Sequence, residues 1–454
     1  MVASGTRVHF VGIGGAGMAP LAEYLKHKGC EVSGSDIVPN KLTHRLEKEG
    51  VCIQYDHNPG AVRDSDLIVY TSAVTEDNPE ISYALNNGKE CIKRSVMLGK
   101  IMEGSKTLCV SGTHGKTTVT AMTGHILKDQ GIDCTVIVGG TIKGTGSNIS
   151  IGKESCIIAE ADEYDRSFLN MKPDSVLINN IEPEHLDIYD GLDDIINTYT
   201  EFALKAGCGG KVFLNGDDDN CQNLKRRLES GAVTYGRNEV NDYRLTSIND
   251  SKNGIEVAFL DKYGNKASGD LPVFGVHNAM NAAGAIAAVS EYGVGLMDAF
   301  KSLRSFEGVE RRYQKIAVIN GCDIILDYAH HPSEISSSVD AARLRGYKSI
   351  NLVFQPHLYS RTRHFLDEFA ASLSSADRVW IAPVYEARKE HESIPVSSEA
   401  IKGRMEDKGF EEVNLIDSIK EVPDVIRENA GFDEVFLLLG AGDIVLVQRE
   451  LTGS

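Results

Sequence analysis

Short apolar runs alternate with helical patterns along the first hundred residues. The runs Arg7–Gly14, Cys30–Asp36 and Asp66–Ala73 are short and bounded by turn residues, which is typical of strands. Between the first two runs, Ala19–Gly29 carries apolar residues at helical spacing. Strands and helices that alternate in this order predict a parallel sheet with crossover helices.

A second unit begins after the polar turn Glu103–Lys106, where we expect a new buried strand at 107–111. Further strand-like runs follow at 155–163, 175–181 and 211–220. The more polar stretch 243–273 alternates with a period of two, which predicts antiparallel strands. A helical pattern over 278–293 closes the unit.

The pattern restarts around Arg311 and Arg312. Apolar runs, each leading into a helical segment, then lie at 322–335, 349–357, 377–383, 411–416 and 434–440. This order predicts a third α/β unit. No internal repeat or low-complexity tract interrupts the chain.

Composition narrows the classes of function. The chain has 454 residues, enough for several domains, and its 47 basic and 65 acidic residues give a net charge of -18. Such a field repels nucleic acid and anionic membranes, so we expect neither as a partner. The nine cysteines include no C-x-x-C pair, which argues against a zinc site or a disulfide framework. The start lacks a signal-peptide pattern and Asp443 interrupts the apolar run 435–447, so a cytoplasmic protein is expected.

The first chemical motif is the stretch VGIGGAGM, which directly follows a predicted strand. Gly12, Gly14 and Gly17 complete a G-x-G-x-x-G pattern, and Asp36 ends the next strand, where dinucleotide folds place a ribose-binding acid. Glycines let the backbone approach a diphosphate, and the following helix directs N–H groups at it. The alternative is a turn that serves only tight packing of strand against helix.

The second motif, VSGTHGKTTVTAM, is close to a phosphate-binding loop. The Walker pattern requires a glycine where this chain has Val110, but the strand, loop and helix order is kept. Lys116 is placed for the β- and γ-phosphates of a nucleotide and the Thr117 hydroxyl for Mg²⁺. A simple helix start would explain neither the glycines nor the lysine.

The third motif is a set of acids at the end of the run SCIIA. Glu160, Asp162 and Glu163 follow this strand, and His185 follows another, SVLINNI. The carboxyl ends of parallel strands share one edge, so these groups are candidate metal ligands. Carboxylates suit Mg²⁺, whereas the imidazole of His185 suits Mn²⁺, Zn²⁺ or Co²⁺ better. Each residue alone is more often a solvated charge at a strand end or a hydrogen-bonded histidine, but after a phosphate loop the metal site is favoured.

These motifs define the expected architecture. The sequence predicts an α/β protein of three domains: a Rossmann-like domain at 1–104, a central P-loop-type ATPase domain with a mostly parallel sheet at 105–312, and a C-terminal Rossmann-like α/β domain at 313–454.

Seven further stretches carry a resemblance to a known family. GTHGKTT, EADEYDRSF, NIEPEHLD, GVHNAMNAAGAIA, DYAHHPSEI, FQPHLYSRTR and GAGDI, in this order, resemble the motif series of the Mur ligases of peptidoglycan synthesis. With GIGGAGMAPLA at the front, the series is most similar to the branch that joins L-alanine to UDP-N-acetylmuramate. The resemblance spans nearly the whole chain and implies these two substrates, together with ATP and Mg²⁺, or Mn²⁺ in its place.

The resemblance also implies roles for individual residues. In the N-terminal domain it implies a UDP-sugar site at Gly12, Gly14, Gly15, Gly17, Asp36, Ser72 and Ala73. In the central domain it implies ATP binding by the loop Gly112, Thr113, His114, Gly115, Lys116, Thr117 and Thr118, and by His277, Asn278 and Asn281. It further implies metal binding by Thr117, Glu160 and His185, nucleotide contacts by Arg312 and Asp327, and contacts of His330 and Arg361 with the acyl group and alanine. Lys116, Glu160, His185, His330 and Arg361 form the implied catalytic set.

One feature departs from the later ligases of that pathway, which carry a lysine that reacts with CO₂ to give a metal-binding carbamate. The helix predicted at 193–206 contains only Lys205, near its end, so no carbamate is expected. Three rival functions stay open on sequence grounds. They are a nicotinamide-dependent oxidoreductase, a sugar-nucleotide sensor without catalysis, and a Mur-type ligase that acts on a peptide, folate or a later muropeptide.

Overall fold

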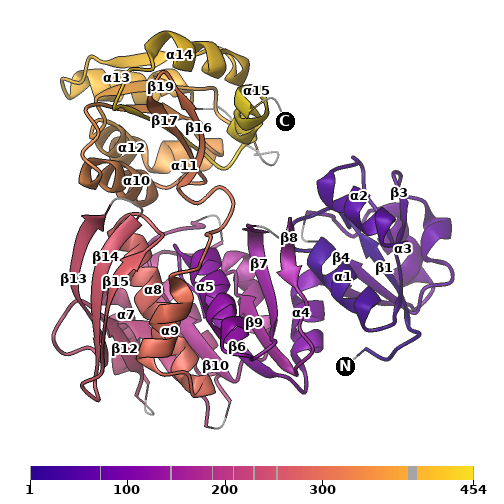
Figure 1. Ribbon diagram of the computed structural model, residues 1–454. Coiled ribbons are helices and arrows are strands. Elements are labelled where there is room, and N and C mark those ends of the chain that lie inside the picture. Colours follow the sequence, from indigo (N-terminus) through magenta and orange to yellow (C-terminus); the bar gives the residue numbers. More distant parts are fainter. Residues whose placement is uncertain are drawn as a thin grey trace. The chain divides into compact units, whose positions relative to one another are not determined.

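The computed structural model contains three β-sheets, each covered by helices (Figure 1). It describes residues 2–71, 73–143, 146–186, 188–207, 209–228, 231–251, 254–386 and 396–452. The chain forms two compact units, which are residues 1–246, 258–268 and 280–307, and residues 247–257, 269–279 and 308–454. The predicted α/β class with mostly parallel sheets is confirmed.

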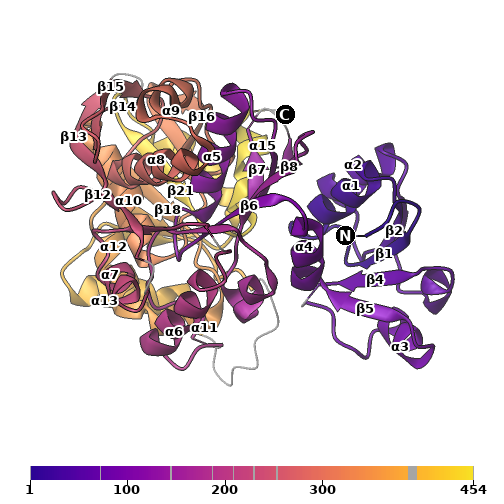
Figure 2. The same cartoon turned by 90° about the horizontal axis from the view of Figure 1, so that it is seen from below.

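The N-terminal sheet has the strand order β3-β2-β1-β4-β5, with every pair parallel. Its strands are β1 (Arg7–Val11), β2 (Glu31–Ser35), β3 (Cys52–Gln54), β4 (Leu67–Tyr70) and β5 (Glu90–Lys93). Its helices are α1 (Ala19–His27), α2 (Lys41–Lys48), the 3₁₀ turn η1 (Pro59–Val62), α3 (Pro79–Asn86) and α4 (Arg94–Met102). Figure 2 shows α1 and α2 on one side of this sheet and α3 on the other. The strand order reverses direction at β1, and ligands of such folds bind at the carboxyl end of this switch point.

The central sheet has ten strands in the order β15-β14-β13-β12-β11-β10-β6-β9-β7-β8. These strands are β6 (Lys106–Ser111), β7 (Thr135–Ile142), β8 (Ser147–Ser150), β9 (Cys156–Glu160), β10 (Ser175–Ile178), β11 (Val212–Asn215), β12 (Val233–Gly236), β13 (Tyr243–Ser251), β14 (Gly254–Asp261) and β15 (Lys266–Leu271). Its helices are α5 (Lys116–Asp129), η2 (Tyr164–Asn170), α6 (Leu192–Ala203), α7 (Asp219–Arg226), α8 (Val276–Val289), η3 (Ser290–Tyr292) and α9 (Leu296–Leu303).

The middle strands of this sheet are parallel and buried on both faces. β6 pairs with β9 and β10, and the register sets Val110 beside Glu160 and Ser111 beside Ile178. Cys109, Ile158 and Leu177 are fully buried, as expected for central strands of a parallel sheet. The three strands therefore end together, and the loops that follow them meet at one edge.

The C-terminal sheet has the order β16-β17-β21-β18-β19-β20. Its strands are β16 (Gln314–Ile319), β17 (Cys322–Asp327), β18 (Ile350–Phe354), β19 (Arg378–Ile381), β20 (Val413–Leu415) and β21 (Val435–Leu439). Its helices are α10 (Pro332–Leu344), α11 (Tyr359–His364), α12 (Leu366–Leu373), α13 (Ser398–Asp407), η4 (Ile419–Glu421), α14 (Val422–Asn429), η5 (Asp443–Leu446) and α15 (Val447–Thr452). All pairs are parallel except β16 with β17.

Two helices have bounds that differ from the sequence prediction. The predicted helix 193–206 ends at Ala203, so Lys205 lies beyond α6 and is exposed. The predicted helix 278–293 begins earlier, at Val276, and changes to a 3₁₀ turn after Val289. Within the described residues, no helix is long and apolar enough to cross a membrane.

Candidate active site

The loop after β6 turns sharply at two glycines before α5 begins. Gly112 and Gly115 have φ angles of 130° and 82°, which L side chains rarely adopt. A Cβ atom at Gly115 would lie 2.4 Å from Oδ1 of Asn281, and one at Gly112 would lie 3.0 Å from the backbone nitrogen of Asn179. The missing outer glycine is explained by position, because Val110 is a fully buried residue inside β6.

Asparagines that follow β10 hold this loop. The backbone N–H of His114 donates to Oδ1 of Asn180 at 2.7 Å, and Nδ2 of Asn179 donates to the carbonyl of His114 at 3.0 Å. Asn179 also donates to Oδ1 of Asn281 at 2.9 Å, which brings the implied nucleotide residue Asn281 to the loop. Sequence reasoning missed both asparagines, although the letters NNI at the end of a buried strand mark the same sheet edge.

Lys116, the first residue of α5, is enclosed by acceptors. Its Nζ donates to the carbonyl oxygens of Gly112 at 2.7 Å and Thr113 at 3.1 Å. It also lies 2.9 Å from both carboxylate oxygens of Glu163, whose side chain is 3% exposed. The ammonium group is therefore held by an ion pair that sequence analysis did not foresee.

Burial and charge act together on this pair. Burial disfavours the charge of Lys116, but the carboxylates of Glu163, Asp162 and Glu184 hold its pKa above the ordinary value. Burial raises the pKa of Glu163 to about 7, and the neighbouring carboxylates add to the rise while Lys116 opposes it. One lysine thus faces several acidic groups, which leaves a net negative charge around it.

The two implied ligands of a first metal ion lie together. Oγ1 of Thr117 donates to Oε2 of Glu160 at 2.9 Å, and the backbone N–H of Gly139 donates to the same oxygen at 2.6 Å. A hydroxyl beside a carboxylate at the start of a phosphate loop is an oxygen set that fits Mg²⁺. Thr118 follows on the same helix and is buried.

His185 lies apart from that pair, in a group with other acids. Its Nε2 is 3.7 Å from Oε1 of Glu163, and the ligand atoms of Asp162, Glu163 and His185 lie within 4.8 Å of one another. Its φ angle is 54°, and Asp165 and Arg166 also have positive φ angles. Strain of this kind concentrates at functional sites. The implied metal residues therefore separate into Thr117 with Glu160, and His185 with Glu163 and Asp162.

The glycine loop after β1 is held by hydrogen bonds to the side chains of Asp36 and Asn40. Gly12, with a φ angle of 82°, follows β1. The N–H of Gly14 donates to Oδ2 of Asp36 at 2.7 Å, and Nδ2 of Asn40 donates to the carbonyl of Gly14 at 3.2 Å. Asp36 therefore fixes the loop, in addition to any contact with a ligand. Ala73 is exposed near the end of β4, and Ser72 lies outside the described residues.

The guanidinium group of Arg94, which sequence analysis did not single out, lies against this loop. A Cβ atom at Gly17 would be 2.8 Å from Cδ and 2.9 Å from Nη1 of Arg94. Arg94 begins α4 directly after β5, so its guanidinium reaches the glycine loop from the same edge of the sheet. In a chain of net charge -18, this guanidinium places positive charge beside the glycine loop.

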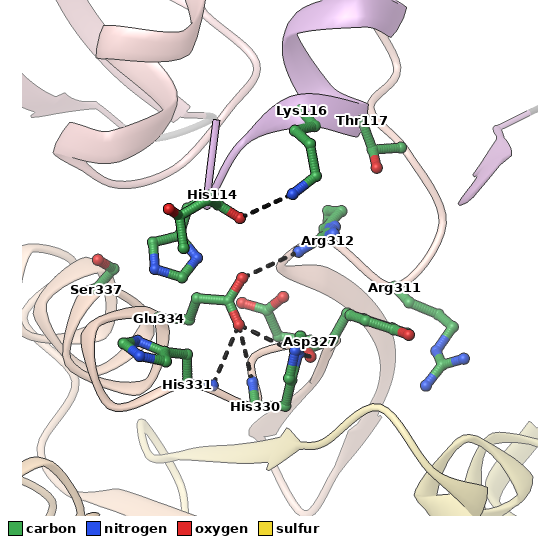
Figure 3. A network of polar contacts seen from close by, with 12 residues as sticks. His114, Lys116, Thr117, Arg311, Arg312, Asp327, His330, His331, Glu334 and Ser337 are labelled. Atoms are coloured by element: carbon green, nitrogen blue, oxygen red, sulfur yellow. Dashed lines mark hydrogen bonds and ion pairs between the residues drawn. The ribbon is translucent and has the colours of Figure 1, made fainter. Parts of the chain in front are cut away.

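In the C-terminal sheet, β17 delivers Asp327 and the residues after it. Asp327 is buried and accepts a hydrogen bond from Oγ of Ser338 at 2.6 Å, and burial raises its pKa. Glu334 accepts the backbone N–H of His330 at 2.9 Å, and its other oxygen lies 3.7 Å from Nη1 of Arg312 (Figure 3). Thus Arg312 and His330 are oriented by one carboxylate.

Arg361 lies on α11 after β18. Its Nη1 is 3.1 Å from Nδ1 of His357, whose ring stacks on Tyr385 at 5.9 Å between centroids. His277 and Asn278 lie in the first turn of α8, where Nδ2 of Asn278 donates to the carbonyl of Phe274 at 2.8 Å. Sequence analysis did not single out His357 or Tyr385. The two residues follow different strands, β18 and β19, so their stacking is not apparent from the sequence.

Comparison with known proteins decides the family. Three family models match consecutive parts of the chain: "Mur ligase family, catalytic domain" at residues 7–106, "Mur ligase middle domain" at 110–289, and "Mur ligase, glutamate ligase domain" at 311–442. This chain belongs to the Mur ligase family.

Individual Mur ligases show the same likeness. A relative from Salinibacter ruber named UDP-N-acetylmuramate–L-alanine ligase is 38% identical over 96% of this chain and 92% of its own length. The crystal structure of UDP-N-acetylmuramate-alanine ligase MurC from Thermotoga maritima is 28% identical, with a TM-score of 0.82 over 98% of both chains. A murein peptide ligase from Psychrobacter arcticus is 23% identical, with a TM-score of 0.73 over 99% of this chain and 98% of its own, which shows a shared fold.

Proposed function

We propose that this Mur ligase joins L-alanine to the lactoyl carboxylate of UDP-N-acetylmuramate at the expense of ATP. The observation that carries the proposal is the near full-length identity of 38% to a relative named for that reaction. Because the reaction consumes ATP and a UDP-activated sugar, we also propose a cytoplasmic location. We assign the UDP sugar to a domain at 1–104, ATP to a domain at 105–312, and alanine to a domain at 313–454.

The residues fit the charge that the reaction develops. The lactoyl carboxylate attacks the γ-phosphorus of ATP, ADP leaves, and an acyl phosphate forms. The neutral amine of alanine then attacks the acyl carbon, inorganic phosphate leaves and the amine loses a proton. Both steps gather negative charge, and Lys116 is placed to stabilise it on the transferring phosphoryl group.

A divalent cation is part of the proposal. Thr117 and Glu160 would hold one Mg²⁺, and His185, Glu163 and Asp162 a second Mg²⁺ or Mn²⁺. When bound, such ions supply positive charge against the phosphoryl oxygens. The excess of carboxylates over the one ammonium group of Lys116 is the feature of this chain that fits them.

Other residues bind and orient the substrates. Gly12, Gly14, Gly15, Gly17 and Ala73, with Ser72, are proposed to line the UDP-sugar site, where Arg94 adds positive charge. Asp36 holds that loop in shape. Asn281, His277 and Asn278 are proposed for adenine, Arg312 and Asp327 for the nucleotide, and His330 and Arg361 for the acyl group and alanine.

The test is a screen for ADP release with UDP-N-acetylmuramate and each amino acid in turn. Release with L-alanine, together with the expected amide product, supports the proposal. Release with a preformed peptide and no amino acid would instead identify a ligase of the murein peptide type. NADH binding without ADP release under any condition would favour the oxidoreductase alternative, and binding of the UDP sugar alone would favour the sensor.

A further inference from the structure

Glu163 serves Lys116 in this structure, yet it also belongs to the group of possible metal ligands. We propose that Glu163 clamps Lys116 while no nucleotide is bound, and becomes a ligand of a divalent cation only after a phosphate takes over Lys116. The inference rests on the proposed ATP site and adds an order of binding to it.

The contacts of Lys116 leave no donor for a phosphate. An ammonium group has three N–H donors, and Nζ of Lys116 has four acceptors within 3.1 Å. Two of them are carbonyls of the loop itself, which the fold holds in place. The two carboxylate oxygens of Glu163 are therefore the acceptors that an incoming phosphate must replace.

The contacts of Glu163 exclude a cation for the same reason. Both of its oxygens lie 2.9 Å from Nζ, so a metal ion at the carboxylate would meet the ammonium charge at close range. Nε2 of His185 stays at 3.7 Å from Oε1, beyond hydrogen-bond distance. The imidazole and the carboxylate face each other without a direct hydrogen bond between them.

Exchange of partners keeps every buried charge compensated. Glu163 is 3% exposed, and a buried carboxylate that loses its ion-pair partner is strongly destabilising. When Lys116 turns to a phosphate, a divalent cation between Glu163, Asp162 and His185 restores the balance. Their ligand atoms lie within 4.8 Å, and opposite ligands of one Mg²⁺ are about 4.2 Å apart, so a small closure suffices.

The test measures Mn²⁺ binding to the full chain at pH 8 by the electron paramagnetic resonance signal of free Mn²⁺, with no UDP sugar or alanine present. Lys116→Ala is expected to raise the affinity of the nucleotide-free protein for Mn²⁺ by roughly tenfold or more, since it frees Glu163. The double variant Lys116→Ala with Glu163→Gln is expected to lose this gain. A non-hydrolysable ATP analogue should produce the gain in the wild type, after correction for Mn²⁺ held by the nucleotide alone.

A matched control is Lys211→Ala, which removes an equal charge from an ion pair with Glu291 at 3.0 Å. It should leave Mn²⁺ binding unchanged. If circular dichroism shows that Lys116→Ala does not fold, Lys116→Met takes its place in the test, because methionine keeps the buried apolar stem of the side chain.

Equal Mn²⁺ affinity of the nucleotide-free wild type and Lys116→Ala would overturn the proposal. So would a gain that persists in the double variant. Because no ligation is assayed, a different acceptor substrate would refute the proposed function and leave this result untouched.

Discussion

Each of two glycine loops in the first compact unit is supported by a buried glutamate, and the two glutamates differ in the direction of their pKa shift. Behind the loop at Gly12, Glu80 accepts Oγ of Ser35 at 2.6 Å, and the carbonyl of Ser35 accepts the N–H of Gly12 at 2.8 Å. Behind the loop at Gly115, Glu163 holds Lys116. Both glutamate side chains are almost fully buried.

Their surroundings move the two pKa values in opposite directions. Burial acts to raise the pKa of Glu80, but the nearby His9 ring and the contacts with Ser35 and His57 outweigh it and lower the pKa. For Glu163, burial and neighbouring acids outweigh Lys116 and raise the pKa. The surroundings of Glu80 thus favour its charged form, whereas those of Glu163 disfavour it.

The largest expected effect separates the two loops by function. Lys116→Ala should lower kcat for ADP formation by roughly 100-fold or more, because the missing charge acts on the transferring phosphoryl group. Binding of UDP-N-acetylmuramate, measured by calorimetry, should stay nearly intact. Lys116→Arg should not restore activity, since a planar fork does not replace a point charge. An equal loss of ADP formation and of UDP-N-acetylmuramate binding would contradict two separate sites.

The reverse separation is expected from Gly14→Val. A Cβ atom there would lie 2.7 Å from Nδ2 of Asn40 and 2.8 Å from Oδ2 of Asp36, so the loop must distort. Binding of UDP-N-acetylmuramate should be lost while ATP binding survives. Gly295→Val is the control, because nothing lies within 4 Å of a Cβ atom at that position, and this variant should bind both ligands normally. Protection of the wild type from proteolysis by NADH, and not by the UDP sugar, would overturn the assignment of this loop.

Measurements of unfolding at different pH values test the lowered pKa of Glu80, in which it differs from Glu163. Glu80→Gln should lower the free energy of unfolding by about 1–3 kcal/mol at pH 7, because buried donors lose a charged acceptor. A carboxyl group with a lowered pKa stabilises the fold above its unfolded pKa, about 4.3, and this contribution is lost as the pH falls through the folded pKa. The gap between Glu80→Gln and wild type should therefore close in acid. The exposed control Glu31→Gln should show no such gap at pH 7; an equal gap at all pH values would refute the account.

The smallest expected effect concerns Lys205. It follows α6 and is exposed, so it should not form a carbamate or bind metal. Lys205→Ala and removal of CO₂ and bicarbonate should each leave the ligation rate unchanged. Activity that vanishes without bicarbonate and returns with it would show that the metal group near Glu163 has an additional ligand.

Local sequence was enough to place both loops, Lys116 and Thr117, because a strand, a glycine turn and a helix start are encoded over a dozen neighbouring residues. It was also enough for the parallel strands β6, β9 and β10, whose apolar runs are nearly continuous. It missed β16, whose residues are mostly half-exposed and lack a clear alternation, so that pairing with β17 decides the strand. The domain limits stay predictions.

What only the tertiary structure decided is which charged groups meet. Glu160 and Glu163 are three residues apart, yet one contacts Thr117 and the other Lys116 and His185. The contact of Arg94 with Gly17 likewise joins residues from opposite ends of a domain-sized segment. Such pairings depend on the register of strands that are distant in sequence and on the path of each chain after its strand ends. The pattern along the chain fixes neither, because it records where a strand ends and not which side chains its neighbours deliver there.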